Sequence, residues 1–311
     1  MENENTPIMD VASKLVETSG LNITPRGAVQ QILQSEALLV LDEVGTLDSV
    51  VFQGGSSIYR CYDGIRLSED LDFRMTNEVL ASEMKQVART IRSRVADHLG
   101  VDPEIKMRGF DDIDPMKTSC LTIKTLVSTN KAVPKVMTKL DFDALPVYEP
   151  ILKTSHSLLD VMRGLSMPVV MAKTAEELVA DKITSAALTG LSHRRNPRSR
   201  DAFDICWLFD NQQIDLQAVG KMARAKVCEY GREEDDLPTG IEAFCASVSY
   251  DDYAPITNLA PMLWDDTVYE QLTEPRTAQE LMRKFVGICA VALNEPSLRA
   301  ALVSTRPHRG I

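Results

Sequence analysis

The chain has 311 residues, 44% of them hydrophobic and 25% charged, which is the ordinary composition of a soluble globular protein. No apolar run approaches the roughly 18 residues that a membrane-spanning helix needs, so we expect no membrane span. Residues 1–5 are acidic and polar, unlike a signal peptide, and the six cysteines are scattered, so we expect a cytoplasmic protein with reduced thiols. The net charge of −11 argues against general nucleic-acid affinity but leaves room for a local basic patch.

The first elements are predicted to be two helices, at residues 8–20 and 26–43. In the second helix the apolar residues recur with helical spacing. A short apolar strand is predicted at 50–53, and two glycines then allow a tight turn. Ser56 can cap the following helix, 56–62. The free N–H groups at this helix start are suited to binding phosphate, so we expect Gly55 and Ser56 to contact a nucleotide.

The segment 69–75 alternates polar and apolar residues and is predicted to be a strand. Residues two apart on a strand point the same way, which places Asp70 and Asp72 side by side. Two such carboxylates repel each other unless a cation or proton lies between them, and oxygen ligands of this kind suit Mg²⁺ or Mn²⁺. Alternatively, the segment is a glycine turn followed by two surface aspartates on an edge strand.

A helix at 77–98 and further strands are expected next. The strands are predicted at 102–108, 118–128 and 135–143. In the last of these strands Asp141 and Asp143 share one face, opposite Leu140 and Phe142. One of these two aspartates could add a further carboxylate to the site. Alternatively, both belong to an acidic strand end that faces solvent.

The next helix begins at Thr174, which forms a capping-box pattern with Glu177. Lys182 lies on or beside the apolar face of this helix, where its charge requires an anion such as a triphosphate or an aspartate. Alternatively, the lysine extends along the helix to reach solvent.

The basic run 193–200 contains arginines that could hold an RNA backbone or a triphosphate, or could belong to a solvated loop. Asp204 follows in a strongly apolar helix, so we expect it to pair with Lys182 or to orient the metal site. Further helices are predicted at 215–230, 239–248 and 275–293, and no catalytic pattern stands out there.

Taken together, the motifs resemble those of the AbiEii/AbiGii toxin family, the nucleotidyltransferases of type IV toxin–antitoxin and abortive-infection systems. The resemblance rests first on Phe52-Gln53-Gly54-Gly55-Ser56 and on Arg66-Leu67-Ser68-Glu69-Asp70-Leu71-Asp72-Phe73. Gln53 stands where the family often has lysine. Downstream, Lys139-Leu140-Asp141, the Glu177–Lys182 helix and Arg200-Asp201-Ala202-Phe203-Asp204 follow in the family's order, so the resemblance covers about residues 26–210.

The resemblance implies a mixed α/β core of the polymerase-beta-like nucleotidyltransferase type, followed by a C-terminal helical domain. We expect the core at 1–172 and the helical domain at 173–311, with the active site in the cleft between them. It also implies that Asp141, favoured over Asp143, is a third carboxylate that joins Asp70 and Asp72 around the metal ion. Lys182 would hold the nucleotide phosphates and Asp204 would orient the site. RNA or phosphate contacts are expected from four arginines: Arg66, Arg195, Arg198 and Arg200.

The function implied is transfer of a nucleotide from an NTP to a hydroxyl, most simply at the 3′ end of tRNA, by a toxin with a separately encoded antitoxin. Two alternatives stay open from the sequence. The acceptor could be a protein or a small molecule, or the chain could bind NTPs without catalysis.

Overall fold

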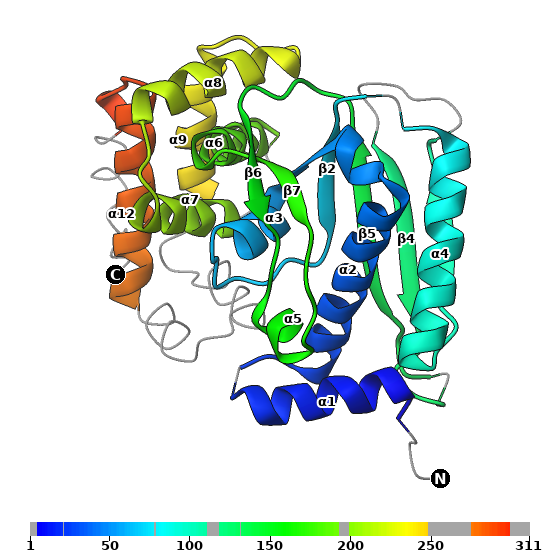
Figure 1. Ribbon diagram of the computed structural model, residues 1–311. Helices are drawn as coiled ribbons and strands as arrows, with labels where there is room; N and C mark the ends of the chain where they lie inside the picture. Colours follow the sequence, from blue (N-terminus) through cyan, green and yellow to red (C-terminus); the bar gives the residue numbers. More distant parts are fainter. Residues whose placement is uncertain are drawn as a thin grey trace. The chain divides into compact units, whose positions relative to one another are not determined.

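The structure is a computed structural model that describes residues 5–20, 22–77, 79–110, 118–130, 132–192, 199–247 and 275–298. Contacts within the chain divide it into two compact units, Met1–Lys173 and Thr174–Ile311. The first unit contains a mixed sheet with helices, and the second unit is helical in its described residues (Figure 1).

The first unit is built on a seven-stranded sheet. The strands lie in the order β3-β4-β5-β2-β1-β7-β6. Their pairings are antiparallel except between β2 and β5 and between β1 and β7, which are parallel. The strands are β1 (Val50–Gln53), β2 (Leu71–Met75), β3 (Glu104–Arg108), β4 (Ser119–Thr125), β5 (Val136–Asp143), β6 (Pro150–Thr154) and β7 (Val169–Lys173).

One face of this sheet is apolar because alternate residues of the central strands are aromatic or aliphatic. Phe52, Phe73 and Phe142 are paired across β1, β2 and β5, and their rings stack with centroids 5.2 Å apart at each step. Helices α2 (Pro25–Val44) and α4 (Ala81–Leu99) lie against the sheet, and the three rings are fully buried (Figure 1). The opposite face carries the polar residues of the same strands.

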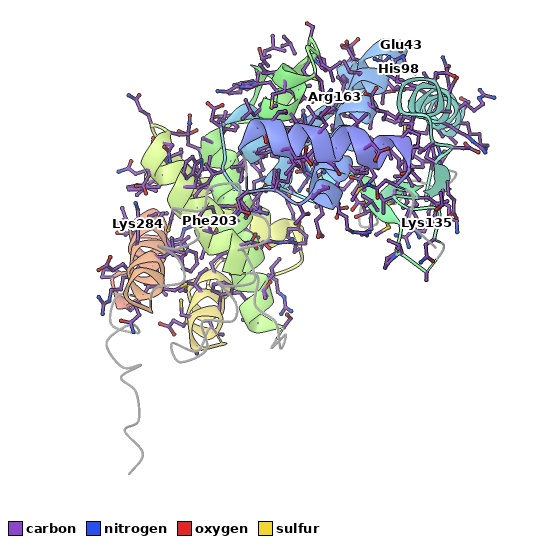
Figure 2. The ribbon with its side chains drawn as sticks, turned by 90° about the horizontal axis from the view of Figure 1, so that it is seen from below. Glu43, His98, Lys135, Arg163, Phe203 and Lys284 are labelled. Atoms are coloured by element: carbon purple, nitrogen blue, oxygen red, sulfur yellow. The ribbon has the colours of Figure 1, made fainter. Side chains whose placement is uncertain are left out.

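The remaining helices of this unit are α1 (Pro7–Ser19), the short 3₁₀ helix η1 (Thr46–Ser49), α3 (Gly54–Cys61) and α5 (Leu158–Met162). A buried carboxylate, Glu36, connects its own helix α2 with α4 and with the end of α5. It accepts hydrogen bonds from Arg94 Nε of α4, at 2.7 Å, and from Arg163, which follows α5. His98, Glu43 and Arg163 lie around this position (Figure 2). The ion pairs therefore hold α2, the long helix behind the sheet, in one orientation.

The second unit contains α6 (Ala175–Leu191), α7 (Ser199–Asn211), α8 (Leu216–Glu229), α9 (Asp236–Ser247) and α12 (Pro275–Ala292). Thr174 caps α6 as predicted, accepting a hydrogen bond from the Glu177 backbone N–H at 3.2 Å. Helices α6 and α9 pack closely because Gly190 and Gly240 leave no room for a side chain between the two backbones. None of the described helices is long and apolar enough to cross a membrane.

Two sequence-based predictions of local structure need correction, and three elements were missed. The strand with the paired aspartates begins at Leu71, so Asp70 lies just before it. The helix after the glycine turn begins at Gly54, and Ser56 is inside its first turn instead of capping it. This early start is possible because Gly54 has φ +74°, which reverses the chain within one residue. Strands β6 and β7 and helix α5 were not predicted.

Candidate active site

The polar face of the sheet places two of the predicted carboxylates directly beside each other. Asp72 of β2 is the parallel partner of Asp141 of β5, and Gln53 of β1 is the partner of Asp72 on its other side. Residues in register on neighbouring strands project from the same face. Asp72 and Asp141 are partly exposed, so both carboxylates are accessible to a ligand on this face.

The third carboxylate, Asp70, is held at the entry to β2. Its Oδ1 accepts a hydrogen bond from the Lys139 backbone N–H at 3.2 Å, and its Oδ2 lies 3.9 Å from Lys139 Nζ. Burial raises the pKa of Asp70, an effect that Lys139 opposes and that the nearby negative charge of Asp141 adds to. A carboxylate with this environment is stabilised in its ionised form by an additional cation.

The donor types on this face fit a divalent metal ion. Carboxylate oxygens are the ligands that Mg²⁺ and Mn²⁺ prefer, and Asp72 and Asp141 are in register. Within the described ranges, no three His, Cys, Asp or Glu side chains are grouped closely enough to hold a metal ion as they stand. Asp70 is directed toward Lys139 and would have to turn from it to join the other two.

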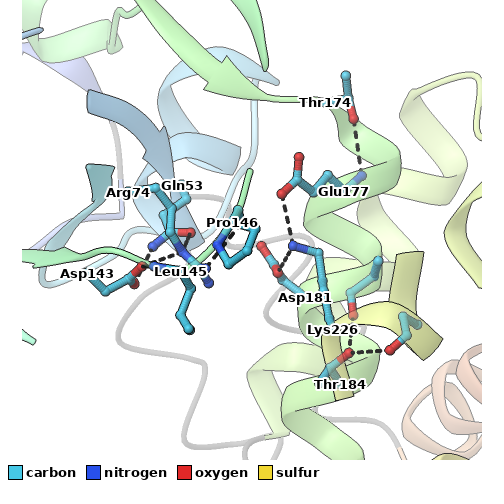
Figure 3. A network of polar contacts seen from close by, with 12 residues as sticks. Gln53, Arg74, Asp143, Leu145, Pro146, Thr174, Glu177, Asp181, Thr184 and Lys226 are labelled. Carbon is cyan, nitrogen blue, oxygen red and sulfur yellow. Dashed lines mark hydrogen bonds and ion pairs between the residues drawn. The ribbon is translucent and has the colours of Figure 1, made fainter. Parts of the chain in front are cut away.

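Asp143 has a different environment from Asp141. Its Oδ1 lies 2.5 Å from Arg74 Nε and also accepts from the Leu145 backbone N–H, while its Oδ2 accepts from Gln53 Nε2 at 2.9 Å (Figure 3). Burial raises the pKa of Asp143, whereas Arg74 and the fully buried Lys173 lower it. Asp143 is thus committed to a buried polar network within the first unit.

The glycine turn touches the carboxylate site. A Cβ atom at Gly54 would lie 2.2 Å from Asp72 Oδ2, which shows how closely the turn approaches that side chain. A Cβ atom at Gly55 would lie 2.6 Å from Arg66 Nη2 and 3.0 Å from Ser68 Oγ. A side chain at either position would force these groups to shift, and at Gly54 the φ of +74° is strained for any other residue as well. The start of α3, with backbone N–H groups that lack helical partners, is therefore next to Asp72.

The first and last of the predicted phosphate-contact arginines differ in burial. Arg66 is 4% exposed, and its Nη1 donates to the Leu67 carbonyl at 3.0 Å. It therefore lies inside the turn and not on an open surface. Arg200 is half-buried in α7. Arg195 and Arg198 lie outside the described residues.

In the second unit, the ion pair predicted between Lys182 and Asp204 is present. Lys182 Nζ lies 3.0 Å from Asp204 Oδ2 and 2.9 Å from Asp201 Oδ1, and both carboxylates are buried. Ser185 Oγ also donates to Asp201, at 2.9 Å. Asp201 therefore binds the lysine, a contact that the sequence analysis did not predict.

Other polar residues of the first unit were not anticipated as part of the site. Lys139 was noted only as part of a motif, although it binds Asp70. Lys173 is fully buried at the end of β7 and was not singled out at all. The available signal was a charged residue at the end of an apolar strand segment, which requires a partner when it is buried.

Comparison with known proteins identifies the family. A family model described as "Nucleotidyl transferase AbiEii toxin, Type IV TA system" matches residues 37–286, which is most of the chain. The chain belongs to the AbiEii nucleotidyltransferase toxin family. The resemblance noted in the sequence is thereby confirmed, and this AbiEii protein is a nucleotidyltransferase. No curated protein matches the sequence.

The chain is also similar to solved structures. MenT4, a nucleotidyltransferase toxin from Mycobacterium tuberculosis H37Rv, is 17% identical to this AbiEii chain with a TM-score of 0.56, and the match covers 95% of this chain and 99% of that one. JHP933 from Helicobacter pylori is 15% identical with a TM-score of 0.44, covering 91% of this chain and 95% of that one. The predicted α/β nucleotidyltransferase fold is confirmed by the likeness to MenT4.

Proposed function

We propose that this AbiEii protein transfers a nucleotide from an NTP to the 3′-terminal hydroxyl of tRNA, in a reaction that requires Mg²⁺ or Mn²⁺. The observation that carries the proposal is the approach of the glycine turn to Asp72, with Asp141 in register on the next strand. A phosphate-binding helix start and a carboxylate pair are the two features that an NTP–metal complex needs, and here they lie next to each other.

In the proposed reaction, the acceptor oxygen attacks the α-phosphorus and the bond from that phosphorus to the bridging oxygen of the β-phosphate breaks. Pyrophosphate leaves with the bonding electrons. Asp141 accepts the proton of the acceptor hydroxyl, and the N–H groups of Gly55 and Ser56 bind the β- and γ-phosphates. A metal ion held by Asp70, Asp72 and Asp141 would supply electrostatic stabilisation of the attacking and leaving oxygens.

The second unit contributes Lys182 to the proposal. Its ammonium group is held by Asp201 and Asp204, and we propose that this pair of carboxylates presents it to the triphosphate. The core that carries the carboxylates would comprise residues 1–172 and the helical domain residues 173–311. As a toxin of a type IV family, the protein would act in the cytoplasm and be opposed by an antitoxin.

The test is incubation of the protein with each α-³²P-labelled NTP and Mg²⁺, with tRNA, total protein or small-molecule extract as acceptor. The proposal expects label in tRNA with the wild type and none with Asp70→Ala. Label only in protein or in small molecules would keep the chemistry but reject the acceptor. Metal dependence is tested in the same assay by adding excess EDTA, which should abolish the label.

A further inference from the structure

The segment Ser68–Asp70 enters β2 without strand pairing of its own. Strand β2 begins at Leu71, so the carbonyl groups of the three preceding residues are outside the hydrogen-bond ladder of the sheet. A buried carbonyl without a partner destabilises the fold, so these groups need partners from elsewhere. The structure supplies a side chain, and in two cases a pair of side chains, for each carbonyl.

The Ser68 carbonyl accepts two hydrogen bonds from α2. Gln31 Nε2 donates at 3.1 Å and Gln34 Nε2 at 2.9 Å. The two glutamines are three residues apart and therefore share one face of the helix. Both are fully buried, with exposed fractions of 1% and 0%. Helix α2 therefore fixes this carbonyl from a position that is closed to solvent.

The next two carbonyls are bound in the same manner. The Glu69 carbonyl accepts from Gln30 Nε2 at 2.9 Å and from Thr138 Oγ1 at 2.8 Å. Gln30 Nε2 also donates to the Met137 carbonyl at 2.8 Å, which ties the segment to β5. The Asp70 carbonyl accepts from Ser56 Oγ in the first turn of α3. Three consecutive carbonyls are thus held by α2, α3 and β5.

One donor is enough to satisfy the Ser68 carbonyl, so folding stability does not explain why two buried glutamines bind it. The amide oxygens of Gln31 and Gln34 are buried, and no donor reaches them in the described part of the chain. An orphaned buried acceptor is unfavourable, and an apolar residue in place of one of the two glutamines would avoid that cost while the other still bound the carbonyl. The two glutamines fix the position of the Ser68–Asp70 backbone. This backbone determines where the Asp70 carboxylate lies and where the Ser68 hydroxyl lies, against Gly55.

We propose that Gln30, Gln31 and Gln34 are positioning residues that fix the backbone of Ser68 and Glu69, so that the Asp70 carboxylate needs only to turn from Lys139 to reach the metal ion. The inference rests on the proposed function. It assigns to α2, a helix that contains none of the quoted signature motifs, a part in the geometry of the site.

The decisive variant is the double replacement Gln31→Leu and Gln34→Leu, which keeps the volume of both side chains but removes both donors. Loss of a group that orients a metal ligand typically weakens metal affinity or activity by 10–100-fold, so we expect the Mg²⁺ concentration for half-maximal activity to rise about 10-fold. The KM for NTP at saturating Mg²⁺ should stay within about two-fold, because the phosphate contacts of the turn are retained.

The matched control is Ser35→Ala. Ser35 lies on the same helix, is equally buried, and donates to Asp160 and to the Gln31 carbonyl instead of to the Ser68–Asp70 backbone. Its loss should lower stability without changing the Mg²⁺ requirement. If the double variant does not fold, the half-buried Gln30→Met replaces it, with the same expected direction.

A readout that does not require turnover is Mn²⁺ binding, measured by electron paramagnetic resonance in the presence of a non-hydrolysable NTP analogue. The double variant should bind Mn²⁺ about 10-fold more weakly, and the amide of Leu71 should exchange hydrogen faster than in wild type. Unchanged Mn²⁺ affinity in a folded double variant would overturn the positioning role. Failure of the proposed function would give a different result. In that case the wild type and Asp70→Ala would show the same Mn²⁺ binding, or neither would bind Mn²⁺.

Discussion

Asp72 and Asp141 are direct partners in the parallel pairing of β2 and β5, and they project from one face of the sheet. Two carboxylates held in this way cannot avoid each other by strand movement, because the register is fixed on both sides by the buried phenylalanine stack. Their mutual repulsion is relieved by a cation, which the proposed reaction supplies together with the NTP.

Asp141 and Asp143 should respond very differently to replacement by asparagine. Loss of Asp141 as proton acceptor and ligand should reduce the rate by about 10²–10⁴-fold. Asp143→Asn should keep most activity but lower the free energy of unfolding by about 1–3 kcal/mol, because Arg74 and Gln53 lose a charged acceptor. Initial rates and urea unfolding of both variants check this. Equal loss of activity in two equally stable variants would contradict the assignment of Asp141.

Gly54→Ala should disable the site more than it destabilises the fold. Gly54 has φ +74°, and an added Cβ atom would lie 2.2 Å from Asp72 Oδ2. The matched control is Gly20→Ala, where φ is +67° and no atom lies within 4 Å. Both variants should lose about 1–2 kcal/mol of stability from backbone strain, and only Gly54→Ala should lose activity as well. Full activity of Gly54→Ala would show that the turn does not contribute to catalysis.

Lys182→Met tests the role of the second unit. Two lysines of that unit, Lys182 and Lys226, are each bound by two carboxylates, and removing either leaves buried negative charge unpaired. Lys226→Met is therefore a control of the same kind. Both variants should be destabilised, but only Lys182→Met should lose activity per folded molecule when tested well below its unfolding temperature. Equal specific activities would remove Lys182 from the proposed site.

Lys226 also gives a prediction for the pH dependence of stability. Its ammonium group binds Glu177 and Asp181 at 2.9 Å each (Figure 3). Burial lowers the pKa of Lys226, but the two carboxylates outweigh this effect and raise it. A lysine whose pKa is higher in the folded than in the unfolded chain stabilises the fold at pH values below the unfolded pKa of about 10.4. This stabilisation is lost as the pH rises through the folded pKa.

The free energy of unfolding of the wild type should therefore exceed that of Lys226→Met by about 3–5 kcal/mol near neutral pH. This difference should shrink above pH ~10.5. Urea unfolding at pH 7.5, 9.5 and 11 measures it. A difference that grows with pH would contradict the sign of the shift.

Cysteine reactivity should separate one thiol from the other five. Cys228 is exposed, whereas Cys61, Cys120, Cys206, Cys245 and Cys289 are buried. Burial raises the pKa of Cys61, Cys206 and Cys245 to about 12 each, so these thiols stay protonated and unreactive at pH 8. Titration with a chromogenic disulfide reagent should detect one thiol in the native protein and six in denaturant. Rapid reaction of two or more native thiols would show that the fold opens.

The environment of Lys182 was predictable from the sequence because it depends on local spacing: the lysine lies beside the apolar face of a helix with a recognisable cap. The alternation of 69–75 did not predict the environment of Asp70, which precedes β2 and is bonded to Lys139. The pairing of Lys182 with Asp204 followed from the cost of burying either charge alone.

The sheet order and the supporting residues were not predictable by the same means. The parallel register that brings Asp141 to Asp72 is set by long-range pairing of strands about 70 residues apart. Likewise, the glutamines of α2 bind the Ser68–Asp70 backbone across 34 to 39 positions. A glutamine in an apolar helix carries no sequence pattern that names its distant partner.

The most direct test of the central claim is the stoichiometry of the reaction. Wild-type protein is incubated with tRNA, Mg²⁺ and α-³²P-labelled NTP, and pyrophosphate release is measured together with the label bound to tRNA, beside Asp141→Asn. The carboxylate mechanism predicts one pyrophosphate for each nucleotide transferred by the wild type, and rates of both products that are lower by about 10²–10⁴-fold with the variant. Wild-type rates from Asp141→Asn, or pyrophosphate release without a labelled acceptor of any kind, would contradict it.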